Sequence, residues 1–141
     1  MQPTVILYPV FVLISLTFLL QFWTARERTG ALKRGEVKVP DIALGQRSWP
    51  ARATQIANSF HNQLEMPVLF YFVVAFALIT SRVDTVLVAL AWAFAVLRLW
   101  HAYIHTTHNT ARQRFLVYAA GVGVLMVMWV YFAAQVLAAG V

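Results

Sequence analysis

The sequence predicts an all-α integral membrane protein, built as a bundle of four transmembrane helices. Of its 141 residues, 61% are hydrophobic and only 11% are charged, whereas a soluble domain carries about 25% charged residues. Four apolar segments each reach the roughly 20 residues that cross a hydrocarbon core about 30 Å thick. Because most connections between them are short, we expect a single four-helix domain over residues 1–141. The chain has no cysteine, which excludes disulfides and thiolate-bound metals.

Sequence features near the ends of the apolar segments indicate where each helix starts. The four segments are residues 4–23, 49–80, 83–105 and 111–138. No basic residue precedes the first segment and no small-x-small site follows it, so we expect a membrane span rather than a signal peptide. Ser48 before Pro50 predicts the first turn of the second helix. Ser81 to Asp84 and Thr110 to Gln113 are interpreted as capping boxes that open the third and fourth helices.

The basic residues predict the orientation in the membrane. The connection between the first two helices, with its edges, carries Arg26, Arg28, Lys33, Arg34, Lys38, Arg47 and Arg52. The turn between the third and fourth helices adds Arg112 and Arg114, and the opposite side of the membrane has only Arg82. The positive-inside rule therefore predicts cytoplasmic basic connections with both termini outside the cytoplasm, and we expect a bacterial inner membrane. The same residues suit contact with anionic membrane lipid, and no nucleic acid partner is expected.

Polar side chains inside the predicted spans are the main indication of a site. They are Asn58, His61, Asn62 and Glu65 in the second helix, Arg98, His101 and His105 in the third, and Arg114 and Tyr118 in the fourth. Spacings of three and four residues place neighbours on one helical face. A rise of about 1.5 Å per residue brings Asn62 and Glu65 level with Arg98 and His101, in the cytoplasmic half. A charge in hydrocarbon costs at least ~2.5 kcal/mol, so we expect these groups to face inward.

Glu65 and Arg98 form the obvious ion pair between the second and third helices. One interpretation is that this pair, with Asn62 and His101, only joins the two helices. The other is a functional site, which the excess of histidine, arginine and tyrosine favours. Pro67 also has two interpretations: a kink that widens the bundle beside the polar residues, or an ordinary proline of a membrane helix.

The predicted site is cationic. Arg112 and Arg114 lie in the first turn of the fourth helix, where the helix dipole disfavours positive charge. Their placement makes sense if an anion binds there, because free backbone N–H groups and guanidinium groups would act together. Orientation in the membrane explains Arg112 at least as well. Arg114 is the better candidate for the site, since Tyr118 follows on the same face.

A metal site is the weaker interpretation of the histidines. His101, His105 and His108 allow two imidazoles on one face, but no acidic residue stands beside them and His108 falls in a turn. Hydrogen-bonded polar residues or ligand contacts are favoured over metal ligands, and no metal is expected.

Three motifs together resemble the MAPEG family, the membrane-associated proteins in eicosanoid and glutathione metabolism. They are His61–Glu65 followed by Pro67, Arg98–His101, and Arg114 with Tyr118, after a long basic first connection. The resemblance covers essentially the whole chain. It implies a homotrimer of four-helix subunits that binds glutathione in a U shape between neighbouring subunits, near the cytoplasmic side.

The resemblance also implies roles for individual residues. Asn62 and Glu65 would hold the amino end of glutathione, and Arg98 and His101 would support this pocket. Arg114 would be the catalytic residue, because a nearby cation lowers the pKa of a thiol and stabilises its thiolate. The other candidates for cofactor binding are Asn58, His61, His105 and Tyr118. The thiolate would attack a lipophilic electrophile that arrives through the bilayer, or reduce a peroxide.

The chain departs from the family pattern at three positions. Glutathione-using relatives commonly have an arginine at the position of Asn58 and tyrosines at those of His101 and His105. Loss of that arginine removes a contact for a carboxylate. Two functions therefore stay open: a membrane-bound transferase or peroxidase that uses glutathione or another thiol, and a non-catalytic trimer that binds lipid or acts as a scaffold.

Overall fold

The computed structural model describes residues 2–43 and 48–139. Arg47, one of the residues used to predict the orientation, lies outside the described residues. In this part of the chain four helical units are long and apolar enough to cross a membrane. They are Pro3–Lys33, Ala51–Ile79, Thr85–Thr106 and Ala111–Ala138. This confirms the predicted class of a helical integral membrane protein with four spans.

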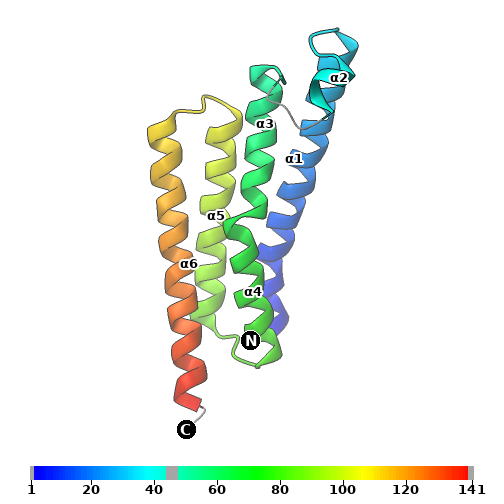
Figure 1. The fold of residues 1–141 in the computed structure, drawn as a ribbon. Helices are drawn as coiled ribbons and strands as arrows, with labels where there is room; N and C mark the ends of the chain where they lie inside the picture. Colours follow the sequence, from blue (N-terminus) through cyan, green and yellow to red (C-terminus); the bar gives the residue numbers. More distant parts are fainter. Residues whose placement is uncertain (1, 44–47, 140–141) are drawn as a thin grey trace.

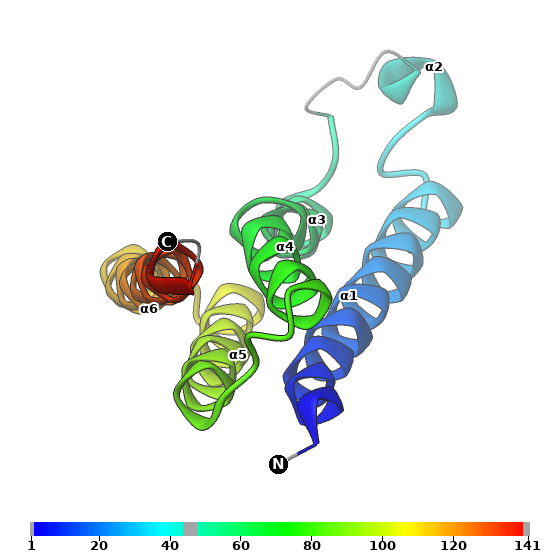
Figure 2. The same cartoon turned by 90° about the horizontal axis from the view of Figure 1, so that it is seen from below.

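The helices run side by side, with both termini at one end of the bundle (Figure 1). In chain order they are η1 (Pro3–Ile6), α1 (Leu7–Lys33), α2 (Val39–Ile42), α3 (Ala51–His61), η2 (Asn62–Leu64), α4 (Met66–Ile79), α5 (Thr85–Thr106) and α6 (Ala111–Ala139). Seen along the bundle, α5 packs against α6 on one side and α1 on the other (Figure 2). The short α2 and the α5–α6 turn lie at the end opposite the termini, which we call the basic end because most arginines and lysines gather there.

The apolar core fills the half of the bundle nearer the termini. Leu13 of α1, Phe70 of α4, Phe94 of α5 and Met128 of α6 are completely buried in one cluster. The Phe70 and Phe94 rings stack with centroids 4.9 Å apart. No described residue of α3 or η2 belongs to this cluster. This cluster therefore closes one half of the bundle, while the basic half has separate buried side chains, such as Leu20, Ile56 and Ile104.

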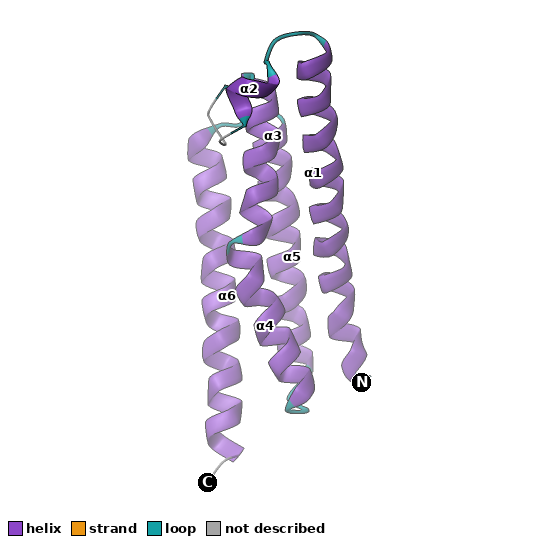
Figure 3. Ribbon diagram, turned by 45° about the vertical axis from the view of Figure 1, so that its right-hand side comes forward, coloured by secondary structure: helices purple, strands orange, loops and turns teal. Residues whose placement is uncertain are grey.

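The second membrane span is interrupted rather than merely kinked. After α3 the chain makes the short 3-10 turn η2, and Glu65 then leaves helical geometry with φ −100° and ψ −105°. The interruption is visible as a loop between α3 and α4 (Figure 3). Pro67 lies in the first turn of α4, where its missing N–H is tolerated. Neither interpretation of Pro67 describes this arrangement fully: the span is distorted beside the polar residues, as the first one expected, but the distortion is a break before Pro67 and not a kink at it.

Two of the predicted helix starts are wrong. Ser81 does not open α5; it ends α4 with φ 56°, and the Arg82 N–H donates to the Ala77 carbonyl at 2.8 Å. These are the features of a Schellman C-cap. Asp84 is instead the N-cap of α5, and its Oδ1 accepts from the Leu87 N–H at 2.8 Å.

The predicted start of α3 is also wrong, whereas that of α6 is confirmed. Ser48 provides no cap, because α3 begins at Ala51 with Pro50 as its N-cap residue and without a side-chain cap. Helix α6 begins at Ala111, as predicted from Thr110. Sequence signals thus located the helices correctly and erred by two residues at the start of α3 and by three at the start of α5.

Candidate functional site

A cleft of about 490 Å³ opens at the basic end between α3, α5 and α6. Its walls are formed by Asn58, His61, Asn62, Glu65, His101, His105, Ala111, Arg114, Phe115 and Tyr118. Below the break in the second span, α4 packs against α6; above it, α3 packs against α1 and α5. The break therefore turns the second span away from α6 and leaves the cleft between them.

Two histidines of α5 form part of the cleft wall. His101 and His105 are each only 3% exposed, and their ring centroids lie 5.7 Å apart in an edge-on arrangement. The Tyr118 ring of α6 lies 5.7 Å from that of His101. Within the described residues, Nδ1 of both histidines has no hydrogen-bond partner. Buried polar atoms normally have partners, so these two enclosed nitrogens are an exception beside the cleft.

Arg98 lies behind the cleft rather than in its wall. It is 2% exposed, and its Nη2 donates to the backbone carbonyl of Asn62 at 2.7 Å. That carbonyl is free to accept because α3 ends where η2 begins. Arg98 thus joins α5 to α3 at the break.

The predicted ion pair between Glu65 and Arg98 is wrong. Glu65 lies in the break itself and is exposed, while Arg98 binds the Asn62 carbonyl instead. Across the described residues, the single ion pair joins Arg34 to Glu36 at 2.6 Å, outside the membrane spans. The hydrogen bond from Arg34 lowers the pKa of the Glu36 carboxyl. The prediction failed because it assumed a continuous second helix.

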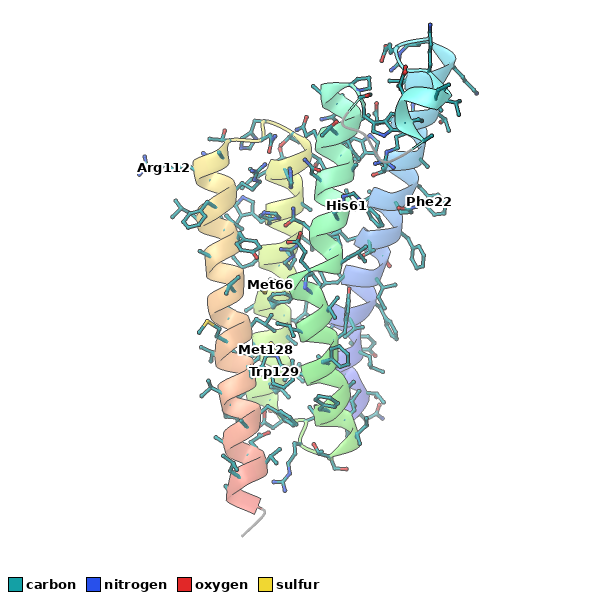
Figure 4. All side chains as sticks on the ribbon, viewed as in Figure 1. Phe22, His61, Met66, Arg112, Met128 and Trp129 are labelled. Carbon is teal, nitrogen blue, oxygen red and sulfur yellow. The ribbon has the colours of Figure 1, made fainter. Side chains whose placement is uncertain are left out.

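Arg114 lies in the cleft wall at the start of α6. Its Nη1 donates to Oδ1 of Asn109 at 2.6 Å. Ala111, the first residue of α6, lines the same cleft, so the N-terminus of the helix contributes to it. Arg112, two residues earlier, is exposed and projects away from the bundle (Figure 4). The structure therefore separates the two arginines as the sequence suggested, with Arg114 at the site.

Eight of the nine predicted site residues line the one cleft, and Arg98 supports it from behind. Their individual roles in binding and catalysis stay predictions. His108 is elsewhere: its Nε2 is 2.8 Å from Oε1 of Gln113 in the α5–α6 turn. Over residues 2–43 and 48–139, no group of three histidine, aspartate or glutamate side chains is arranged to hold a metal ion.

Arg52 and Gln55 of α3 were not predicted to support the site. Arg52 Nη1 donates to the Thr106 carbonyl at 2.7 Å, and Gln55 Nε2 donates to those of His105 at 2.8 Å and Thr107 at 3.2 Å. These carbonyls end α5 and have no partner within the helix. The Arg52 guanidinium also lies 5.2 Å from the Trp23 ring. In the sequence Arg52 indicated only orientation, because nothing marked which helix end it would reach.

A polar cluster at the opposite end of the bundle was also missed. Asp84 accepts hydrogen bonds from the Tyr131 hydroxyl and, at 2.7 Å, from Gln135 Nε2. Arg82 donates to the Gln135 carbonyl at 3.1 Å. This cluster ties the start of α5 to the last turns of α6. The half nearer the termini therefore has polar contacts of its own. In the sequence, Asp84 was interpreted only as part of a capping box.

Comparisons with known proteins agree with this architecture at the level of the family. Neither the curated proteins nor the solved structures contain a match to the chain. The family model described as MAPEG family matches residues 6–134, which is nearly the whole chain. It spans all four membrane helices and every residue of the cleft wall. The chain therefore belongs to the MAPEG family of integral, multi-pass membrane proteins.

Proposed function

We propose that the protein binds glutathione or a related thiol in the cleft and adds its thiolate to lipophilic electrophiles, or uses it to reduce peroxides. The observation that carries the proposal is that Arg114 and Glu65, from α6 and the break after α3, line one cleft. A cation and an anion facing one space suit a zwitterionic thiol. Family membership supports a membrane function related to glutathione but names no substrate.

The chemistry follows from the charges in the cleft. Glu65 and Asn62 would bind the ammonium end of the thiol peptide, and Arg114 would face the sulfur. A guanidinium group and the free N–H groups at the start of α6 both stabilise an anion, so they lower the pKa of a bound thiol. The thiolate sulfur then forms a bond to the electrophilic carbon and the leaving group departs with the bonding electrons. For a peroxide, two thiols are oxidised to a disulfide while the O–O bond is reduced.

A homotrimer is proposed as the working form. Glu65 and Asn58 are exposed on an isolated subunit although they belong to a membrane span. A charge exposed to hydrocarbon costs at least ~2.5 kcal/mol. A neighbouring subunit that covers the open side of the cleft would remove this cost and would place the bound thiol between subunits.

The orientation proposed from the sequence serves this chemistry. With the basic end in the cytoplasm of a bacterial inner membrane, a water-soluble thiol reaches the cleft from the cytoplasm. A lipophilic electrophile reaches it through the bilayer. Phe115, a lining residue that is 66% exposed, provides an apolar rim for such a molecule.

The proposal is tested with purified protein by thermal shift and by conjugation of chlorodinitrobenzene. Glutathione, or another small thiol, is expected to raise the melting temperature. Arg114→Ala should lower the conjugation rate roughly 100-fold or more, the usual loss when a donor to a developing anion is removed. Arg112→Ala is the matched control, because Arg112 lies in the same turn of α6 but points away from the cleft.

One result would replace the proposal by its alternative. If no thiol shifts the melting temperature and a phospholipid copurifies with the protein, the cleft belongs to a non-catalytic lipid-binding or scaffold protein. Equal losses of activity in Arg114→Ala and Arg112→Ala would show instead that charge at this end of the bundle matters in general, without a specific site.

A further inference from the structure

The α5–α6 turn holds a residue that acts on the cleft without lining it. We infer that Asn109 is the positioning residue for Arg114: it holds the guanidinium group at the cleft wall and leaves its charge free for the sulfur anion. This inference rests on the proposed thiol chemistry for its effect on rate, but the hydrogen bond itself is part of the structure. Asn109 is not among the residues of the cleft wall.

The backbone of Asn109 is fixed by its place in the turn. Its φ of 49° lies in the left-handed region, which asparagine tolerates better than most residues. Its N–H donates to the Ile104 carbonyl at 2.8 Å and so closes the end of α5. The last carbonyls of α5 accept hydrogen bonds from Arg52 and Gln55 of α3. A backbone held on both sides gives the Asn109 side chain a defined starting point.

The side chain of Asn109 reaches across the turn to Arg114. Its Oδ1 accepts from Nη1 of Arg114 at 2.6 Å, and the contact is partly buried. An arginine in the first turn of a helix is disfavoured by the helix dipole and has many rotamers, so it needs a partner to stay in one place. Within the described part of the chain, this is the side-chain hydrogen bond that Arg114 makes.

The neutrality of the partner matters as much as its position. An amide oxygen orients a guanidinium group but does not neutralise it. An aspartate at the same position would orient Arg114 equally well, yet its negative charge would compete with a bound thiolate for the same cation. Asn109 thus has two functions, orientation of Arg114 and preservation of its charge, and two substitutions separate them.

Asn109→Gly removes the acceptor but keeps the backbone, because glycine adopts positive φ without strain. Asn109→Asp keeps both the acceptor and the tolerance for positive φ but adds charge. Gln113→Ala is the matched control: Gln113 lies just after the same turn and bonds to His108, not to Arg114. All three variants are expected to melt within a few degrees of the parent protein, because the substituted positions are at the surface end of the bundle.

Two measurements are made on each protein in detergent. The first is the rate at which phenylglyoxal modifies Arg114, followed by mass spectrometry of its peptide, which needs no thiol. The second is the ultraviolet absorbance of bound glutathione thiolate as a function of pH. We expect Asn109→Gly to speed the modification severalfold and Asn109→Asp to leave it unchanged or slower. Both variants should move the thiol titration upward by about one pH unit, which is a tenfold loss of thiolate at any pH well below the titration midpoint.

The outcomes separate this inference from the proposed function. If Asn109→Gly leaves the modification rate and the thiol titration as in the parent protein, Asn109 does not position Arg114. If the modification rate rises but even the parent protein binds no thiol, the positioning role stands and the proposed function fails. If Gln113→Ala changes both measurements as much as Asn109→Gly does, the effect belongs to the turn as a whole and the inference is overturned.

Discussion

The two halves of the bundle use the same four spans in opposite ways. Near the termini, α4 packs against α6 and buried side chains such as Phe70, Phe94 and Met128 fill the space between the helices. At the basic end, α3 packs against α1 and α5, and a cleft lined by polar side chains remains beside α6. The break at residues 62–65 is the boundary between them.

This difference shows how a small membrane protein can combine rigidity with a polar site. Packing of large apolar side chains holds the half near the termini, where no break occurs. In the other half, buried side chains such as Ile56 and Ile104 are supplemented by hydrogen bonds to backbone carbonyls. Arg98 binds the end of α3, and Arg52 and Gln55 bind the end of α5. Helix ends are therefore the attachment points of the site, because only there are carbonyls free to accept.

The largest effect on stability is expected when a buried side chain is removed from the apolar half of the bundle. Phe94→Ala removes a fully buried ring that stacks on Phe70, and we expect the free energy of unfolding to fall by about 3–5 kcal/mol. Unfolding in sodium dodecyl sulfate mixtures measures this change. Phe22→Ala is the control, since Phe22 is 72% exposed and points away from the bundle (Figure 4). Comparable losses in the two variants would show that no single apolar cluster holds the fold.

A smaller effect is expected when the basic half is altered behind the cleft. Arg98→Met removes a hydrogen bond to the Asn62 carbonyl, worth about 1.5–3 kcal/mol, together with a buried charge that costs at least ~2.5 kcal/mol. Because these two terms nearly cancel, the melting temperature should change little. Thiol affinity should still fall about tenfold, or ~1.4 kcal/mol, since Asn62 loses its anchor.

Isothermal titration with glutathione measures the affinity of the Arg98→Met variant. Unchanged affinity would mean that Arg98 only joins two helices, which was the alternative interpretation of this residue. A large loss of stability would mean that the buried charge is compensated by groups beyond its single hydrogen bond.

The smallest effect is expected from a substitution in the polar cluster of Asp84, Tyr131 and Gln135, at the end of the bundle that holds the termini. Tyr131→Phe removes the hydroxyl that donates to Asp84, and we expect the free energy of unfolding to fall by about 0.5–1.5 kcal/mol. Thiol binding at the other end should be the same as in the parent protein. Altered binding in this variant would show that the two ends of the bundle are coupled, against the division proposed above.

The position of the site could be predicted from the sequence because charged and polar residues are rare in membrane spans. Asn62, Glu65, His101 and Arg114 stand out against an apolar background. Helical spacing with a fixed rise brings the first three to one level and Arg114 nearer the same end of the bundle. Family resemblance and physical argument led to the same residues. The fold was predictable for the same reason, since length and apolar composition largely determine what crosses a bilayer.

The partners of these residues could not be predicted. The ion pair of Glu65 with Arg98 followed from an ideal helix, whereas the real partner of Arg98 is a backbone carbonyl exposed by a break. Asn109 and Gln55 were overlooked for a related reason. Their targets are an arginine across a turn and the last carbonyls of another helix, and sequence spacing gives no indication of which helix ends meet in space.

Because the chain has no native cysteine, single-cysteine labelling tests most directly whether the cleft is a ligand site. Ala111→Cys places a thiol in the cleft wall, and Ala91→Cys places one in the buried apolar cluster. A water-soluble maleimide should label position 111 and spare position 91, and S-hexylglutathione, which has no free thiol, should slow labelling at 111 at least severalfold. Labelling at position 111 that proceeds at the same rate with saturating S-hexylglutathione as without it would contradict the account.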